Sequence, residues 1–202
     1  MYKGLFIALE GGEGAGKSTM AQLLKEKLQQ QGKEVIITRE PGGIPSAEAI
    51  RNNIMDFYVD SKTELLLYLS ARREHLVNKI IPCLEEGKIV ITDRFYLSSL
   101  VYQGHARGLG IDRVRELNSF VCENVYPDLN ILLDIPPEIG LLRKAEAKDL
   151  NRLDLESKEF HQKVNEGYKI LVKQNQDKIV VIDATKNIDE ILNTIISYLD
   201  RV

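Results

Sequence analysis

The chain has 202 residues, of which 44% are hydrophobic and 28% are charged, and its formal net charge is -3. This length suits one domain with a single core, and the composition is ordinary for a globular protein. The small negative charge and the lack of a long basic run argue against an extended nucleic-acid surface. The apolar runs are too short to cross a membrane, and the first residues lack the apolar region of a signal peptide.

The two cysteines, Cys83 and Cys122, stand apart with no CxxC pattern. This arrangement indicates a reduced, cytoplasmic protein, and we expect both thiols to serve packing rather than catalysis.

Short apolar runs alternate with longer helical stretches along the chain. A strand is predicted at 5–9 before a helix at 17–31, and a second strand at 34–38 before a helix at 46–58. One long helix is predicted over 63–86, then a strand at 88–92 and helical segments to about 125. The last elements are strands at 129–133 and 178–182 and helices at 137–149, 157–174 and 188–198. This alternation predicts an α/β fold, a parallel sheet with helices on both faces.

A glycine-rich loop joins the first predicted strand to the first predicted helix. It matches GxxxxGKS/T, the phosphate-binding P-loop, and comprises Gly11, Gly12, Glu13, Gly14, Ala15, Gly16, Lys17 and Ser18, followed by Thr19. Its backbone N–H groups and the following helix N-terminus suit phosphate oxygens. Lys17 would reach the β- and γ-phosphates and Ser18 would bind Mg²⁺. The loop therefore predicts nucleoside triphosphate binding, without saying what is done with the nucleotide.

A second charged pair, Asp93 and Arg94, directly follows the strand at 88–92. A carboxylate there lies at the rim of the sheet beside the P-loop, where Asp93 can hold Mg²⁺. Arg94 can bridge the two phosphoryl groups being joined. The chain lacks the NKxD and DxxG motifs of a GTPase, so a small kinase is favoured.

Several motifs together resemble the bacterial thymidylate kinase family. They are EGGEGAGKST at 10–19, TREPGG at 38–43, ELLLY at 64–68 with Arg72, DRF at 93–95, SSLVYQG at 98–104 and NRLD at 151–154. The resemblance runs from about 6 to 183. It implies a five-stranded P-loop fold in one kinase domain over 1–202, with a flexible lid at about 142–154. It further implies transfer of the γ-phosphoryl of MgATP to dTMP, giving dTDP and ADP in dTTP biosynthesis, by a homodimer.

Tyr68 and Arg72 are four residues apart on a predicted helix and share one face. An aromatic ring can stack on a base, and a guanidinium offers only donors, which favours the thymine O4 acceptor over the cytosine amino group. The same spacing also fits an ordinary amphipathic helix with an exposed arginine.

The resemblance assigns further residues to the acceptor site. Tyr102 would pack under the deoxyribose and disfavour a 2′-hydroxyl, with Ser99 and Gln103 near the thymine edge. Arg51 would bind the acceptor phosphate. Glu40 and Pro41 would shape the pocket, and Glu13 would face the sugar and the metal.

The charged segment at 143–154 supplies candidates for stabilising the transferring phosphoryl group. Some thymidylate kinases carry an arginine in the P-loop, where this chain has Gly14, so the lid would supply it here. Arg143 is the first choice and Arg152 would contact the ATP phosphates, with Lys144 and Lys148 as alternatives. A solvated charged helix fits the same residues. Gly14→Arg is expected to rescue Arg143→Ala in part.

Two other functions fit the P-loop. One is a small P-loop kinase for a different nucleotide or a nucleoside, although Arg51 argues for an acceptor that carries a phosphate. The other is a nucleotide-binding regulatory module without turnover, against which stand the intact Lys17, Ser18, Asp93 and Arg94.

Overall fold

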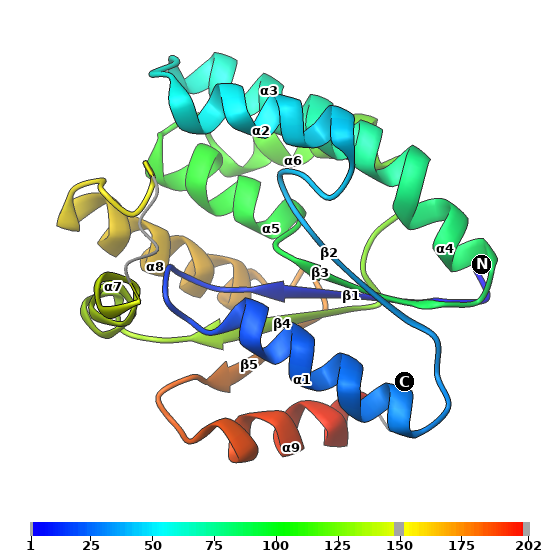
Figure 1. Ribbon diagram of the computed structural model, residues 1–202. Helices are drawn as coiled ribbons and strands as arrows, with labels where there is room; N and C mark the ends of the chain where they lie inside the picture. Colours follow the sequence, from blue (N-terminus) through cyan, green and yellow to red (C-terminus); the bar gives the residue numbers. More distant parts are fainter. Residues whose placement is uncertain (1, 148–151, 200–202) are drawn as a thin grey trace.

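The computed structural model describes residues 2–147 and 152–199. Its centre is a five-stranded parallel sheet in the order β2-β3-β1-β4-β5 (Figure 1). The strands are β1 (Leu5–Glu10), β2 (Val35–Arg39), β3 (Ile89–Asp93), β4 (Leu129–Asp134) and β5 (Ile179–Asp183). The predicted α/β fold with a parallel sheet is therefore confirmed, and each strand lies within one residue of its predicted position.

Helices cover both faces of this sheet (Figure 1). They are α1 (Lys17–Gln30), α2 (Pro45–Asp56), α3 (Ser61–His75), α4 (Ile81–Glu85), α5 (Tyr96–Ser99), α6 (Ile111–Cys122), α7 (Pro137–Glu146), α8 (Lys158–Gln174) and α9 (Ile188–Leu199). None of the helices in the described ranges is long and apolar enough to cross a membrane.

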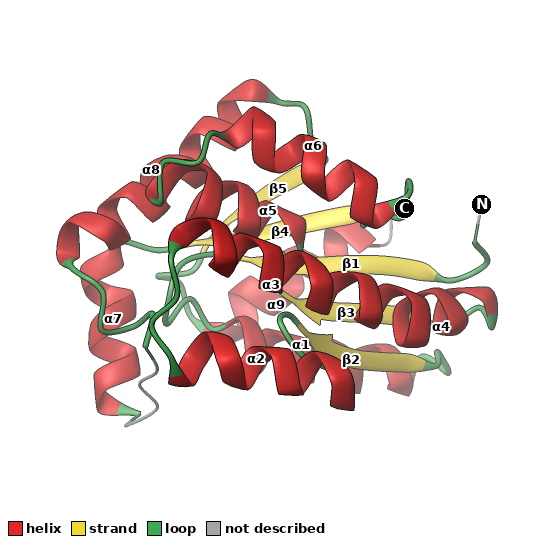
Figure 2. Cartoon of the chain, turned by 90° about the horizontal axis from the view of Figure 1, so that it is seen from above, coloured by secondary structure: helices red, strands yellow, loops and turns green. Residues whose placement is uncertain are grey.

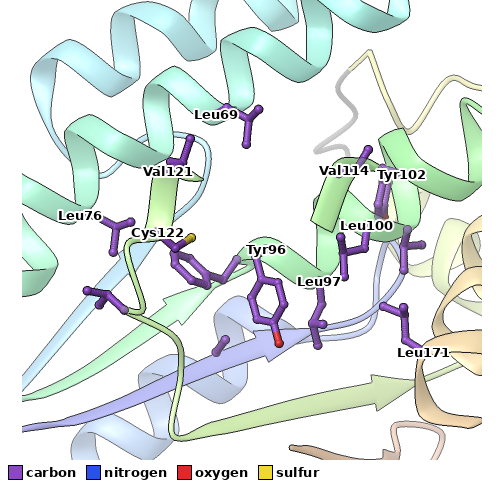
Figure 3. Close-up of a cluster of buried hydrophobic side chains, with 14 of the residues drawn as sticks. Leu69, Leu76, Tyr96, Leu97, Leu100, Tyr102, Val114, Val121, Cys122 and Leu171 are labelled. Carbon is purple, nitrogen blue, oxygen red and sulfur yellow. The ribbon is translucent and has the colours of Figure 1, made fainter. Parts of the chain in front are cut away.

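Alternating residues of the central strand face two separate cores. Ile7 and Leu9 lie in a core completed by α1 and α9, with Leu24 and Ile195 among its members. Phe6 and Ala8 lie in the opposite core, completed by residues of α3, α5, α6 and α8 (Figure 3). Because successive side chains of a strand point to opposite faces, one apolar strand can serve both cores.

The predicted helix over 63–86 is not a single regular α-helix. Leu76–Ile80 is π-helical and separates α3 from α4, and Pro82 lies in the first turn of α4. Proline has no N–H and its ring clashes with the carbonyl four residues earlier, so regular α-helix cannot run through this point. A second π-helical segment, Leu100–Ala106, follows α5 and ends before α6.

Parallel pairing places the carboxyl ends of all strands at one edge of the sheet. Leu9 of β1 pairs with Asp93 of β3, and Arg39 of β2 lies opposite the same aspartate. The helix α7 lies at this edge in both views (Figures 1 and 2). The loop after β1, the end of β3 and the start of the predicted lid therefore meet in one place.

Candidate active site

The P-loop wraps from β1 into α1, which begins at Lys17. Its lysine is 7% exposed, and the ammonium donates hydrogen bonds to the carbonyl oxygens of Gly12 at 2.9 Å and Gly11 at 3.2 Å. Burial and the nearby Arg94 lower the pKa of Lys17, while Asp93, Glu13 and Glu10 oppose that shift. The loop thus concentrates positive charge at the start of a helix, where an anion is stabilised.

Gly14 lies in the left-handed region with φ 67°, and a Cβ there would lie 1.9 Å from the carbonyl oxygen of Gly140 in α7. A Cβ on Gly140 would in turn lie 2.0 Å from the carbonyl oxygen of Glu13. The P-loop and α7 therefore touch backbone to backbone, and this contact requires glycine on both sides.

The two residues predicted to hold a metal ion lie together. The Ser18 hydroxyl donates a hydrogen bond of 2.6 Å to the Asp93 carboxylate, although the residues are 75 positions apart. A hydroxyl and a carboxylate are the hard oxygen ligands that Mg²⁺ takes, together with water and substrate phosphates. No group of three or more His, Cys, Asp or Glu side chains among the described residues could hold a metal ion. The two protein oxygens suit an ion that takes its remaining ligands from the nucleotide and water.

Arg94, Glu13 and Tyr102 form a charged cluster between the P-loop and the acceptor side. The Arg94 guanidinium donates to Glu13 at 2.7 Å and to the Gly11 carbonyl at 2.9 Å, and lies 4.9 Å from the centre of the Tyr102 ring. The Tyr102 hydroxyl donates to the same Glu13 oxygen at 2.9 Å. Burial raises the pKa of Glu13, but Arg94, Lys17 and Tyr102 outweigh it and lower the pKa to about 2. Glu13 is therefore ionised at neutral pH.

A cleft of about 740 Å³ opens at the carboxyl edge of the sheet. Its lining joins residues of the P-loop, β2, α2, α3, β3, α7 and α9, including Arg39, Arg51, Tyr68, Asp93, Arg94, Arg143, Lys144 and Lys186. A smaller pocket lies beside it and shares Glu40, Tyr68, Arg94 and Leu153 with the cleft. The smaller pocket also holds Arg72, Phe95, Ser98, Ser99, Tyr102 and Gln103. Every acceptor residue predicted from sequence lines one of these two connected spaces.

Arg72 lies at the floor of the smaller pocket and is only 1% exposed. Its guanidinium donates to Glu40 at 2.7 Å, to the Ser99 hydroxyl at 3.1 Å and to the Asn118 side-chain oxygen. It also lies 4.9 Å from the centre of the Phe95 ring. The alternative of an exposed, snorkelling arginine is therefore wrong, because three elements hold this group in one orientation.

Glu40 links Arg72 to a buried histidine that sequence reasoning did not place in the site. His75 Nδ1 lies 3.1 Å from the second Glu40 oxygen, and His75 Nε2 lies 2.6 Å from the Thr38 hydroxyl. The Arg51 guanidinium donates to the Pro41 carbonyl at 3.0 Å. The strand end at Thr38–Pro41 is thus fixed by side chains of α2 and α3.

The lid candidates divide between two places. Arg143 and Lys144 of α7 line the cleft, where Arg143 donates to the Ala184 carbonyl at 3.1 Å and Lys144 lies 3.6 Å from Asp154. Arg152 is absent from the cleft lining and instead donates to Glu64 of α3 at 2.5 Å. Lys148 lies outside the described residues.

Several residues at the site were given no role from the sequence. Leu153 lines both spaces, and Ala184, Lys186 and Ile188 line the cleft after β5. The position of Ala184 just beyond a strand end was a usable signal, since the same rule identified Asp93. Leu153 and Asn118 required the tertiary structure.

The sheet order, the loop after β1 and the carboxylate at the end of β3 define a P-loop nucleotide-binding protein. A family model described as thymidylate kinase matches residues 9–195. The thymidylate kinase of Shouchella clausii (strain KSM-K16) is 49% identical, with 100% of this chain and 97% of that protein covered. That of Clostridium novyi (strain NT) is 46% identical, with 98% and 100% covered.

A crystal structure of thymidylate kinase from Ehrlichia chaffeensis is similar with a TM-score of 0.79 and 33% identity, covering 97% of this chain and 98% of that one. The chain therefore belongs to the thymidylate kinase family. The predictions of this family, and of a phosphotransferase that uses dTMP, are confirmed.

Proposed function

We propose that the protein transfers the γ-phosphoryl of MgATP to dTMP, giving dTDP and ADP, and so serves dTTP biosynthesis. The observation that carries this proposal is the connection of the P-loop cleft to a pocket floored by Arg72 and walled by Tyr68 and Tyr102. The cleft has room for a triphosphate, the small pocket holds the side chains predicted to contact the base, and Arg94 lines both.

On the donor side, the P-loop backbone and Lys17 would hold the ATP phosphates. Ser18 and Asp93 would hold Mg²⁺, whose positive charge would offset that of the phosphates. The cleft continues to Ala184, Lys186 and Ile188, which supports a place for the remainder of the ATP molecule there.

On the acceptor side, Arg51 would bind the dTMP phosphate, and its position on the cleft wall supports this role. Tyr68 would stack on thymine, and Arg72 would donate to the thymine O4 oxygen. Tyr102 would lie against the deoxyribose, where its bond to Glu13 leaves its ring fixed. A ring held in this way would exclude a 2′-hydroxyl by contact.

The chemical step would need no general base, because a phosphate monoester is mostly dianionic at neutral pH, its second pKa being about 6. Catalysis would rest on alignment and charge neutralisation. Arg94 would bridge the donor and acceptor phosphates, and Arg143 remains the first choice for the lid cation. Lys144 is the nearest alternative, since it also lines the cleft and its charge helps to lower the pKa of Glu13. Contact of Arg152 with ATP phosphates stays a prediction.

We also propose a cytoplasmic homodimer that pairs through α3 and α6, which pack against each other. Large apolar side chains are exposed there, with Phe120 of α6 at 83% and Leu66 of α3 at 57%. Such exposed apolar side chains are typical of an interface between proteins. Light scattering should give twice the chain mass for the wild-type protein and the chain mass for Phe120→Glu.

The proposed reaction is tested by ADP release with MgATP and dTMP, dUMP, dCMP, UMP, AMP, GMP or thymidine. We expect fastest turnover with dTMP, weaker turnover with dUMP and none with dCMP. Chelation of Mg²⁺ should abolish turnover, and Asp93→Asn should lower it while ATP binding persists. Turnover with thymidine or AMP instead of dTMP would mean that the acceptor is another nucleotide or a nucleoside. ATP binding without any turnover would favour a regulatory module.

A further inference from the structure

Glu64 is a buried carboxylate on α3 that no part of the proposed phosphoryl transfer uses. It is 1% exposed and lies one helical turn before Tyr68. Its two oxygens accept hydrogen bonds from three side chains. Gln103 donates at 2.9 Å, Arg107 donates twice at 3.3 Å and Arg152 donates at 2.5 Å. The donors come from the π-helical segment 100–106, the turn after it and the segment after α7.

Two arginines surround Glu64 and keep its carboxylate ionised. Burial raises its pKa, but the hydrogen bonds from Gln103, Arg152 and Arg107 outweigh burial and hold the pKa below its usual value. Arg107 also donates to Glu156 at 2.6 Å and lies 4.4 Å from the centre of the Phe160 ring. Loss of the Glu64 charge would leave Arg152 without its carboxylate partner in a mostly buried position.

The contact with Glu64 fixes the orientation of Gln103. An ionised carboxylate can only accept hydrogen bonds, so the Gln103 amide nitrogen must face Glu64. The amide oxygen is then the atom that Gln103 can offer to the small pocket, which it lines. An acceptor at this place complements an N–H donor of the base, and a reversed amide would present a donor instead.

The contact with Glu64 also fixes Arg152 and so the short segment that begins there. Arg152 directly precedes Leu153, which lines both the cleft and the small pocket. Glu64 therefore connects the helix that carries Tyr68 and Arg72 to the segment that contributes an apolar wall to the same pocket. A side chain of α3 thus ties this segment to the base pocket.

We propose that Glu64 is a positioning residue, whose carboxylate orients Gln103 and holds Arg152 so that the base pocket and the adjoining Leu153 are ordered together. This inference rests on the proposed function, because it concerns the acceptor side of the same site. It assigns a role to a residue that lines neither the cleft nor the small pocket.

The test is a double-mutant cycle of Glu64→Gln and Arg152→Gln, with steady-state kinetics for both substrates. We expect Glu64→Gln to raise KM for dTMP about tenfold, the effect of losing one charge-assisted hydrogen bond, with KM for ATP changed less than about twofold. Turnover of dCMP, absent in the wild-type protein, should become measurable, because the amide of Gln103 can reverse. The double variant should be no worse than the poorer single variant, since both remove one contact.

Glu74→Gln is the matched control, because Glu74 is exposed on the same helix and, among the described residues, its carboxylate accepts hydrogen bonds from the exposed Ser46 and Asn78. It should leave both KM values and the dCMP discrimination unchanged. Equal rises of the two KM values, or fully multiplicative effects in the cycle, would overturn the inference. If Glu64→Gln fails to fold, Arg152→Gln alone decides, since unchanged KM for dTMP in that variant rejects the role. Absence of dTMP turnover in the wild-type protein would reject the proposed function itself, and the inference with it.

Discussion

Arg72→Met is the most informative substitution at the acceptor pocket. Methionine keeps a long unbranched side chain against Phe95 but removes the charge and every hydrogen bond. Those bonds join Arg72 to Glu40, Ser99 and Asn118, and both partners of the Arg72–Glu40 ion pair are at most 3% exposed. The substitution therefore removes a predicted base contact and an internal tie at the same time.

The two effects have different sizes. Removing one partner of a buried ion pair costs about 3–5 kcal/mol of stability, because the other charge is left without compensation. In a domain of about this size each kcal/mol lowers Tm by about 2–4 °C, so Tm should fall by about 6–20 °C. Loss of a charged hydrogen bond to thymine is worth about 1.5–3 kcal/mol, which raises KM for dTMP about 10- to 160-fold. KM for ATP should stay within about twofold.

Calorimetry measures the first effect and initial-rate kinetics the second. Arg73→Met is the matched control, since Arg73 is the next residue of α3, its side chain is 40% exposed and it pairs with the exposed Glu123. An exposed ion pair contributes at most about 1 kcal/mol. The Tm of Arg73→Met should therefore fall by no more than about 4 °C, with KM for dTMP unchanged.

A second substitution separates the two roles of Arg72. Glu40→Gln in the Arg72→Met background removes the uncompensated carboxylate charge, so Tm should recover in part while KM for dTMP stays high. Equal Tm losses for Arg72→Met and Arg73→Met would refute the burial reasoning. Equal rises of KM for dTMP and ATP would refute the base contact.

Three further predictions concern the P-loop and its neighbours. Gly14→Arg should fail to rescue Arg143→Ala and should lower Tm, because its Cβ would meet the Gly140 carbonyl at 1.9 Å and its φ is positive. The depressed pKa of Glu13, about 2 against a usual 4.5, corresponds to about 3 kcal/mol of stability. This contribution is complete above about pH 4.5 and is lost as the pH falls towards 2, so the free-energy difference between wild type and Glu13→Gln should shrink over that range in urea titrations. Tyr102→Phe removes the 2.9 Å bond to Glu13 and should lower kcat/KM for dTMP about tenfold, with weaker discrimination against the ribonucleotide.

Each of these has a distinct contrary result. A Tm for Gly14→Ala equal to that of Gly12→Ala would remove the steric explanation, since a Cβ on Gly12 meets nothing within 4 Å. A Glu13→Gln difference that stays constant from pH 7 to pH 3 would mean that Glu13 is not ion-paired in solution. If Tyr102→Phe discriminates against the ribonucleotide as well as the wild-type protein does, then the aromatic ring is selective without the hydroxyl, and the hydrogen bond to Glu13 is not needed for selectivity.

Local sequence was sufficient wherever the determining interactions lie within a few residues. The P-loop requires glycine at positions of positive φ directly before a helix, so its pattern is readable in eight residues and Lys17 begins α1 as expected. The strands were readable because buried parallel strands are short apolar runs between helices. The break in the helix at Leu76–Ile80 was missed, although Pro82 was a visible signal.

The residues that the sequence left undecided depend on partners far along the chain. Spacing alone fitted either an exposed Arg72 or a buried one, and the choice was made by Glu40, Ser99 and Asn118, which lie 32, 27 and 46 positions away. The contact of Arg152 could not be predicted either, because its partner Glu64 is 88 positions away in the sequence. No periodicity or motif records such pairs.

The sequence by itself determined the α/β fold and the P-loop, and it predicted that Ser18 and Asp93 lie at the same place. These follow from local chemistry or from the rule that parallel strands end at one edge of a sheet, whereas most acceptor residues were predicted from the resemblance to a family. Only the tertiary structure decided that Arg72 is rigid, that Gly14 must remain glycine against α7, and that Arg152 pairs with Glu64 rather than lining the cleft. The physical reason is that a buried charge must pair with groups that are close in three dimensions, and folding brings together residues that are far apart in the sequence.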